Sequence, residues 1–125
     1  MIRKAKPNDL KRIIEITKAC AAFMISNNIF QWNEHYPNIA TFKNDLKEES
    51  LYVIEKNEKV IGCIVMSQIM DEFYQNVNWI TSSEKNLYLH RLAIHPKFQK
   101  MGFAKQLMYF SFDFAQKNNF VSIRL

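Results

Sequence analysis

The segment that most constrains how this chain can fold runs from residue 89 to residue 107 and reads LHRLAIHPKFQKMGFAKQL. It predicts an apolar strand, a turn marked by Pro96, a basic loop that contains Gly102, and then a helix. A helix that begins directly after such a loop presents unpaired backbone N–H groups and the positive end of its dipole. The segment therefore predicts an anion cradle for phosphate or pyrophosphate, with nearby lysines adding positive charge.

The spacing of residues inside this segment is specific. It reads Leu92-x-Ile94-x-Pro96-x-x-Gln99-x-x-Gly102-x-Ala104. This pattern resembles the acetyl-CoA-binding signature of the GCN5-related N-acetyltransferases, the GNAT superfamily, in which alternating aliphatic residues and a proline precede Arg or Gln-x-x-Gly-x-Gly or Ala. A dinucleotide-binding fingerprint is excluded because its glycines are missing, and a Walker loop is excluded because no Gly-Lys-Ser or Gly-Lys-Thr is present.

The resemblance implies an acetyl-CoA site in this loop. Backbone N–H groups would hold the pyrophosphate, and Lys100 would support them electrostatically. The residues concerned are Gln99, Lys100, Met101, Gly102, Phe103 and Ala104. The strand end before the loop would pair with the pantetheine amides through its main chain, at Leu92, Ala93 and Ile94. The small side chains of the loop would let a pyrophosphate approach closely; a tightly packed helix start is the competing interpretation.

Acetyl transfer to an amine requires a neutral nucleophile and a polarised thioester carbonyl. The resemblance implies direct attack of the amine on acetyl-CoA, and Cys20 and Cys63 are not placed as nucleophiles. His90 is the candidate base, because the ordinary pKa of a histidine is about 6.5. A purely structural histidine is the competing interpretation, and Glu72 and Glu84 are weaker candidates for the base.

Aromatic residues gather between the first two expected helices, in the stretch that runs from Gln31-Trp32 to Tyr36-Pro37. The resemblance places part of the acceptor pocket there, which makes Trp32 and Tyr36 candidate walls of the acceptor site. Aromatic residues that clamp a loop to the core are the alternative. The acceptor stays open between small-molecule and peptide amines, because one fold can serve many substrates.

Hydrophobic periodicity and turn residues predict the remaining elements. Strands are expected over 2–5, 51–55, 59–66, 87–94 and 120–125, and helices over about 10–27, over 39–48 and after the basic loop. Asn8 or Asp9 is expected to cap the first helix. A polar turn over 56–58 is expected to close a hairpin.

This order, β-α-α-β-β-β-α-β, predicts a single α/β (α+β) domain over residues 1–125, with a GNAT-like mixed central sheet flanked by helices. In the family another helix and two strands follow the fifth strand. That helix commonly carries an Asn that contacts the cofactor and a Tyr that protonates the leaving thiolate. The chain looks truncated at this point, so a non-catalytic CoA-binding or interaction module is the alternative to an active enzyme.

The last strand would leave an open sheet edge, which predicts association. A homodimer that covers this edge is the expected state. Tyr109, Phe110 and Phe112 fall partly off the apolar stripe of their helix, and exposed aromatic residues of this kind predict a contact surface.

The net charge of +5, from 17 basic and 12 acidic residues, suits an anionic partner. A phosphorylated cofactor fits this charge; nucleic acid is a weak alternative because no binding motif accompanies the charge. No apolar run reaches the roughly 18 residues that a membrane-spanning helix needs. Cys20 and Cys63 lie in apolar contexts without metal-ligand spacing. They are expected to be buried free thiols in a reducing, cytoplasmic compartment.

Overall fold

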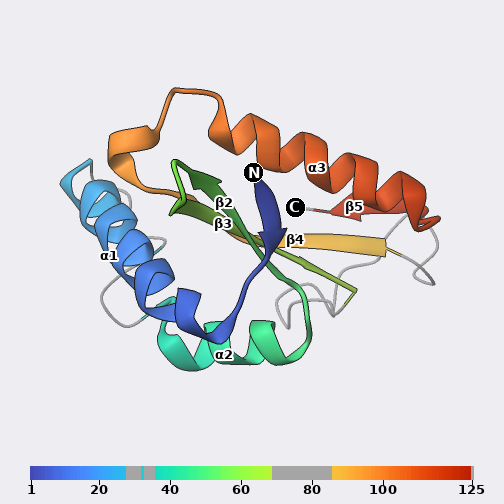
Figure 1. Cartoon of the computed structure of the whole chain (residues 1–125), viewed down its shortest axis with the longest axis horizontal. Helices are drawn as coiled ribbons and strands as arrows, with labels where there is room; N and C mark the ends of the chain where they lie inside the picture. The colour runs from blue at the N-terminus through green and yellow to red at the C-terminus, as the bar shows by residue number, and fades with distance from the viewer. Residues whose placement is uncertain (28–31, 33–35, 69–85, 125) are drawn as a thin grey trace.

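The computed structural model describes residues 1–27, 32, 36–68 and 86–124. Within these residues a mixed five-stranded sheet has the order β1-β2-β3-β4-β5, and β4 and β5 form its parallel pair (Figure 1). The strands are β1 (Ile2–Lys4), β2 (Leu51–Lys56), β3 (Lys59–Ser67), β4 (Asn86–Ile94) and β5 (Ser122–Arg124). The helices are α1 (Leu10–Ser26), α2 (Ile39–Lys47) and α3 (Phe103–Lys117), with short 3₁₀ turns η1 (Pro7–Asp9) and η3 (Pro96–Phe98). The predicted order of strands and helices is confirmed.

Helices cover both faces of the sheet (Figure 1). α1 and α2 pack on one face over a cluster that includes Ile13, Phe42 and Val53. α3 packs on the other face over a second cluster, which includes Ile54 and Leu107. Because successive strand residues point to opposite faces, a sheet covered on both sides requires strands that are apolar throughout. The apolar runs of β2 and β3 satisfy this requirement.

β2 and β3 form the predicted hairpin, with a turn one residue shorter than expected. Lys56 pairs with Lys59, which leaves Asn57 and Glu58 as the turn residues. Both have positive φ angles, of 53° and 65°. Two central residues with positive φ define a type I′ turn, whose twist matches that of the flanking strands.

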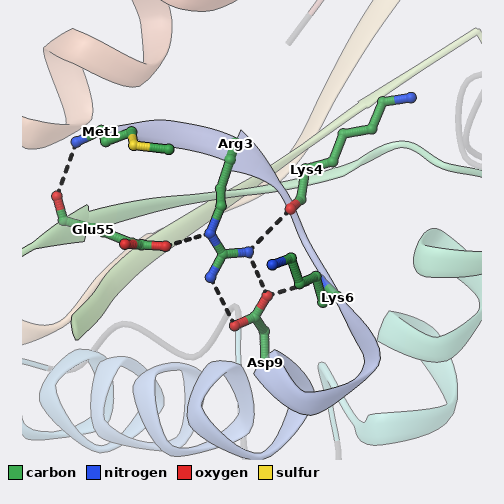
Figure 2. A network of polar contacts seen from close by, with 6 residues as sticks. All are labelled: Met1, Arg3, Lys4, Lys6, Asp9 and Glu55. Atoms are coloured by element: carbon green, nitrogen blue, oxygen red, sulfur yellow. Dashed lines mark hydrogen bonds and ion pairs between the residues drawn. The ribbon is translucent and has the colours of Figure 1, made fainter. Parts of the chain in front are cut away.

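The start of α1 is fixed by a polar network rather than by a capping side chain (Figure 2). Asp9 occupies the cap position that the sequence predicts, but its carboxylate makes no capping hydrogen bond. Instead it accepts from the backbone N–H of Lys6 at 2.7 Å and from two nitrogens of Arg3, at 2.8 and 3.0 Å. Arg3 also donates to Glu55 of β2. The network therefore ties β1 to β2 and to the entry of α1.

β4 contains an irregularity that matters for the site. His90 pairs with Val65 and Ala93 pairs with Cys63, so β4 has one residue more than β3 between these two pairs. This is a β-bulge, and Arg91 within it has a φ of 49°. Parallel pairing to β5 extends only over Asn86–Tyr88, so the bulged half of β4 lies beyond its register with β5. A bulge bends its strand and re-aims the local backbone and side chains.

The close approach of β3 and β4 beside the bulge depends on Gly62. A Cβ atom at this position would lie 2.5 Å from Cδ1 of Ile94 and 2.7 Å from the carbonyl oxygen of Ala93. Neither contact is sterically possible, and the second one involves backbone. Gly62 is therefore required by packing, where the sequence alone gave no reason for it.

Two expectations about the C-terminal elements are corrected. The strand predicted over 120–125 is shorter, and Phe120 packs instead against Phe114 of α3, with ring centroids 6.0 Å apart. Tyr109 and Phe112 are exposed as predicted, but Phe110 is half-buried and packs on Tyr52 at 5.6 Å. Phe110 belongs to the core because α3 lies more broadly on the sheet than its apolar stripe suggests.

Candidate functional site

The basic loop between η3 and α3 is held in shape by its own short contacts. The side-chain amide of Gln99 donates to the carbonyl oxygen of Ile94 at 2.9 Å, which closes the loop onto the end of β4. Nδ1 of His95 accepts from the backbone N–H of Lys97 at 3.1 Å. Burial, followed by the nearby cations, lowers the pKa of His95. A neutral His95 leaves Nδ1 able to accept this bond at physiological pH.

The backbone N–H groups from Lys100 to Lys105 donate no hydrogen bond to any residue that the structure describes. The first helical bond of α3 is donated by Gln106 to the carbonyl oxygen of Gly102, at 3.0 Å. A consecutive run of unsatisfied donors at the positive end of a helix dipole is the arrangement that binds phosphate groups.

Two left-handed residues give the loop its shape. Lys100 has a φ of 63° and Gly102, at the cap of α3, has a φ of 90°. A Cβ atom on Gly102 would meet no atom within 4 Å. Tight protein packing, the competing interpretation of this glycine, is therefore wrong. The left-handed backbone accounts for glycine here, and the space beside it is open to a ligand.

A hollow of about 410 Å³ lies against this loop on the α3 side of the sheet. Its lining consists of Leu92, Ile94, Phe98, Gln99, Lys100, Gly102, Phe103, Ala104 and Lys105. Most of the residues predicted to bind the cofactor are thus brought together. Two are not: Met101 is exposed outside the lining, and Ala93 is buried in the α1/α2-side cluster.

Lys56, at the hairpin end of β2, reaches the same loop and was missed by the sequence analysis. Its Nζ lies 5.9 Å from the ring centroid of Phe98 and 5.6 Å from that of Phe103. The two rings contact each other edge to face, at 6.4 Å. Contact of this kind between a cation and aromatic faces is attractive. It brings one more positive charge to the loop from a strand far away in the sequence.

His90, the candidate base, lies on the opposite face of the sheet from this hollow. It pairs with Val65, whose side chain belongs to the α1/α2-side cluster, and it is half-buried. Its ring stacks with that of Tyr88, with centroids 6.3 Å apart and planes 7° from parallel. Glu72 and Glu84 lie outside the described residues.

Next to His90, Arg91 forms a bidentate ion pair with Asp45 of α2. Nε of Arg91 donates to one carboxylate oxygen at 2.7 Å and Nη2 to the other at 2.6 Å. The Asp45 side chain is 6% exposed and that of Arg91 is 13% exposed, so the pair is largely removed from water. Burial alone would lower the pKa of Arg91, but the hydrogen bonds and charge of Asp45 outweigh it and raise that pKa.

The two candidate walls of the acceptor site have different surroundings. Trp32 packs partly buried against the α1/α2-side cluster. Tyr36 is 40% exposed, and its hydroxyl oxygen accepts from Nη1 of Arg91 at 3.3 Å. Tyr36 therefore lies beside the bulge of β4, whereas Trp32 also serves the core, as the alternative interpretation holds.

Both cysteines are buried free thiols, as predicted. Burial raises the pKa of Cys20 to about 11 and that of Cys63 to about 12. Their sulfur atoms donate to backbone carbonyl oxygens of β4, that of Ile94 at 3.1 Å and that of Arg91 at 3.6 Å. Thiols held in this form are poor nucleophiles.

A family model described as the Acetyltransferase (GNAT) family matches residues 10–125. The chain belongs to this family. It is therefore an acetyltransferase of the GNAT type, and acetyl-CoA is the donor that this family generally uses.

Solved structures agree with this assignment. A Staphylococcus aureus Mu50 protein assigned to the acetyltransferases is 28% identical with a TM-score of 0.78, over 95% of this chain and 74% of that one. A GNAT acetyltransferase from Streptococcus agalactiae 2603 is 21% identical with a TM-score of 0.76, over 87% and 66% of the two chains. One from Listeria monocytogenes 4b F2365 is 16% identical with a TM-score of 0.78, over 96% and 72%. The last two likenesses concern the fold alone.

A search of curated protein sequences found no significant match. Among the residues that the structure describes, no helix has the length and apolar character needed to cross a membrane. The same residues contain no cluster of His, Cys, Asp or Glu side chains that could hold a metal ion.

Proposed function

We propose that this chain is an acetyl-CoA-dependent N-acetyltransferase that transfers an acetyl group directly to a primary amine. Membership of the GNAT family gives acetyl transfer. The observation that carries the rest is the run of N–H groups from Lys100 to Lys105, which donate to no described residue, beside a hollow of about 410 Å³. Donors in this array, at the start of a helix, suit the oxygens of a pyrophosphate.

In this proposal the pyrophosphate of acetyl-CoA lies over the loop from Gln99 to Ala104, and Lys100 adds positive charge. The pantetheine arm follows β4 at Leu92, Ala93 and Ile94, beyond its register with β5. Main-chain pairing there resembles the addition of a strand to a sheet edge. Ala93 can take part through its backbone even though its side chain is buried.

The amine attacks the carbonyl carbon of the thioester, a C–N bond forms, the C–S bond breaks, and CoA leaves as a thiolate. The amine must lose a proton and the thiolate must gain one. His90 is our candidate for accepting the amine proton, because it lies next to the bulge on the α1/α2 face, where we expect the amine. If His90→Gln leaves the pH dependence of kcat/KM unaltered, His90 has no part in proton transfer.

The acceptor amine is expected on the α1/α2 face, between His90 and the side chains of Trp32 and Tyr36. Tyr36 supports this placement because it is exposed and contacts the bulge through Arg91.

A cytoplasmic location suits the two reduced cysteines. A homodimer remains our expectation, with the exposed Tyr109 and Phe112 of α3 as contact candidates; light scattering of the purified chain tests this.

Binding of acetyl-CoA is the experiment that tests the cofactor assignment. Gly102→Glu places a negative charge and a bulky side chain in the open space beside the loop, and we expect it to abolish binding in calorimetric titration. Gly102→Ala is the matched control: a left-handed backbone destabilises it by the same amount, about 1–2 kcal/mol, but it adds no charge and little bulk. It should bind with a near-normal Kd. Equal affinity of the Glu variant and the wild type would overturn the assignment.

The alternative, a non-catalytic CoA-binding module, predicts a different combination of results. Such a module would bind acetyl-CoA but release no free thiol when amines are added. A panel of a polyamine, an aminoglycoside and a short peptide with a free N-terminus distinguishes the two functions.

A further inference from the structure

The ion pair between Arg91 and Asp45 is largely buried, and its arginine lies within the apolar strand β4. A charged side chain in an apolar strand must find a partner, because an unpaired buried charge is very costly. Arg91 finds it on α2, a helix 46 residues earlier in the sequence, through two short hydrogen bonds. A buried ion pair adds little net stability compared with apolar residues of similar size. Stability alone therefore explains this pair poorly.

The backbone of Arg91 gives a second, independent observation. Its φ of 49° is a left-handed value in a residue that is not glycine. Such a conformation persists only where the surroundings impose it, and it is concentrated at functional sites. The surroundings here hold both ends of Arg91: Asp45 binds the guanidinium, and the thiol of Cys63 donates to the Arg91 carbonyl oxygen at 3.6 Å.

The same guanidinium also reaches Tyr36. Nη2 and Nε of Arg91 are occupied by Asp45, and Nη1 donates to the Tyr36 hydroxyl at 3.3 Å. One side chain thus joins α2, the bulge of β4 and the exposed aromatic ring beside it. The pair is also neutral overall, so Arg91 does not present an uncompensated positive charge to an approaching amine, which is itself cationic before it loses its proton.

We propose that Asp45 and Arg91 are positioning residues for acetyl transfer: the ion pair fixes the bulge of β4 in the shape that receives the acetyl end of the cofactor and holds Tyr36 at the acceptor side. This inference rests on the proposed function. Neither residue needs to touch the reacting atoms. Their effect is transmitted through the backbone of Arg91 and Leu92 and through the hydroxyl of Tyr36.

The chain offers a matched control in the pair between Arg3 and Asp9, which is also bidentate, at 2.8 and 3.0 Å. Asp9→Asn weakens an arginine–aspartate pair at β1, three strands away from the bulged β4 in the sheet, and Asp45→Asn weakens the one beside the bulge. Both substitutions keep the size and shape of the side chain. A general loss of stability should appear in both variants, whereas a positioning role should appear only in Asp45→Asn.

The test uses amide resonances of the ¹⁵N-labelled full chain, recorded while acetyl-CoA is added. In the wild type and in Asp9→Asn we expect the amides of residues 100–105 and those of Arg91 and Leu92 to shift. In Asp45→Asn the loop amides should respond with a Kd within about twofold of the wild-type value, while the Arg91 and Leu92 response is lost. With an amine that the wild type acetylates, kcat should fall about 100-fold in Asp45→Asn, with little change in the KM for acetyl-CoA.

The possible outcomes separate this inference from the proposed function. If the loop amides of the wild type do not respond, the cofactor assignment itself fails. If they respond but Arg91 and Leu92 do not, or if Asp45→Asn behaves as the wild type, the positioning role is wrong. An equal loss of the bulge response in Asp9→Asn would also overturn it. Should Asp45→Asn fail to fold, Arg91→Lys keeps the charge, breaks the bidentate geometry and is read in the same way.

Discussion

The entry of α1 and the bulge of β4 each hold an arginine against an aspartate, and both pairs are bidentate: Arg3 binds through Nη1 and Nη2, and Arg91 through Nε and Nη2. In the first, Arg3 of the edge strand β1 and Asp9 are 6 residues apart and share a network with Glu55 of β2 (Figure 2). In the second, Arg91 and Asp45 are 46 residues apart and join α2 to the interior strand β4. The same chemistry secures a chain end in one place and a strained strand in the other.

The comparison teaches that a bidentate contact alone does not separate a structural ion pair from one that we propose serves a site. The surroundings do. Arg3 lies in an ordinary strand, whereas Arg91 has a left-handed backbone inside a bulge and contacts an exposed tyrosine. The second pair also adjoins the stretch of β4 that we propose receives the cofactor. Variants of the two pairs can therefore break or sharpen this comparison.

The largest effect on stability is expected from removing one partner of the inner pair. Asp45→Leu leaves the Arg91 guanidinium buried without its carboxylate, which should lower the free energy of unfolding by about 3–5 kcal/mol. The double variant Asp45→Leu/Arg91→Met removes both charges and should recover much of that loss. Urea denaturation measures both. A double variant no more stable than the single one would show that packing, rather than the unpaired charge, dominates here.

A smaller and pH-dependent effect is expected at the outer pair. The hydrogen bonds from Arg3 are the main cause of the lowered pKa of Asp9, and they outweigh its partial burial. Since the pKa is lower in the folded chain, the pair stabilises it fully above the unfolded value of about 3.9, and this stabilisation is lost as the pH falls through the folded value. Asp9→Asn should cost about 1–3 kcal/mol at pH 7.

The pH dependence of the stability difference shows whether the charge of Asp9 is the cause. The difference in unfolding free energy between the wild type and Asp9→Asn should shrink as urea denaturation is repeated at progressively lower pH, below about 4. A difference that stays constant with pH would mean that the charge of Asp9 does not contribute.

The smallest effect is expected from Tyr36→Phe, which removes one exposed hydroxyl from the inner network. Stability should stay within about 0.5 kcal/mol of the wild type. The KM for the amine should rise by at most about tenfold, the equivalent of one hydrogen bond, while the KM for acetyl-CoA stays unchanged. A change in the KM for acetyl-CoA alone would contradict the placement of Tyr36 at the acceptor side and place it on the cofactor side.

Much of the fold and part of the site follow from local sequence. The basic loop could be predicted because Pro96, Gln99 and Gly102 lie close together in the sequence. A left-handed cap followed by a helix start is also a local property. The hairpin could be predicted for the same reason. Its exact turn could not, because the choice between two and three turn residues depends on the pairing register of β2 and β3.

The inner ion pair could not be predicted, although a signal was present. An arginine in the apolar strand LHRLAI has to be neutralised, so Arg91 itself could have been singled out. Its partner could not, because 12 acidic residues compete until the fold brings α2 against the bulge. Lys56 was missed in the same way, since its contact with Phe98 and Phe103 exists only once the hairpin lies beside α3. Long-range contacts require the tertiary structure.

The most direct test of the whole account is amine-dependent release of CoA thiol from acetyl-CoA, measured side by side for the wild type, Gly102→Ala and Gly102→Glu. The account predicts release by the wild type and by the Ala variant, and none above background by the Glu variant. Release by the Glu variant at the wild-type rate would contradict the claim that the loop from Gln99 to Ala104 is the cofactor site. Absence of release by the wild type across the amine panel would contradict its assignment as an active N-acetyltransferase.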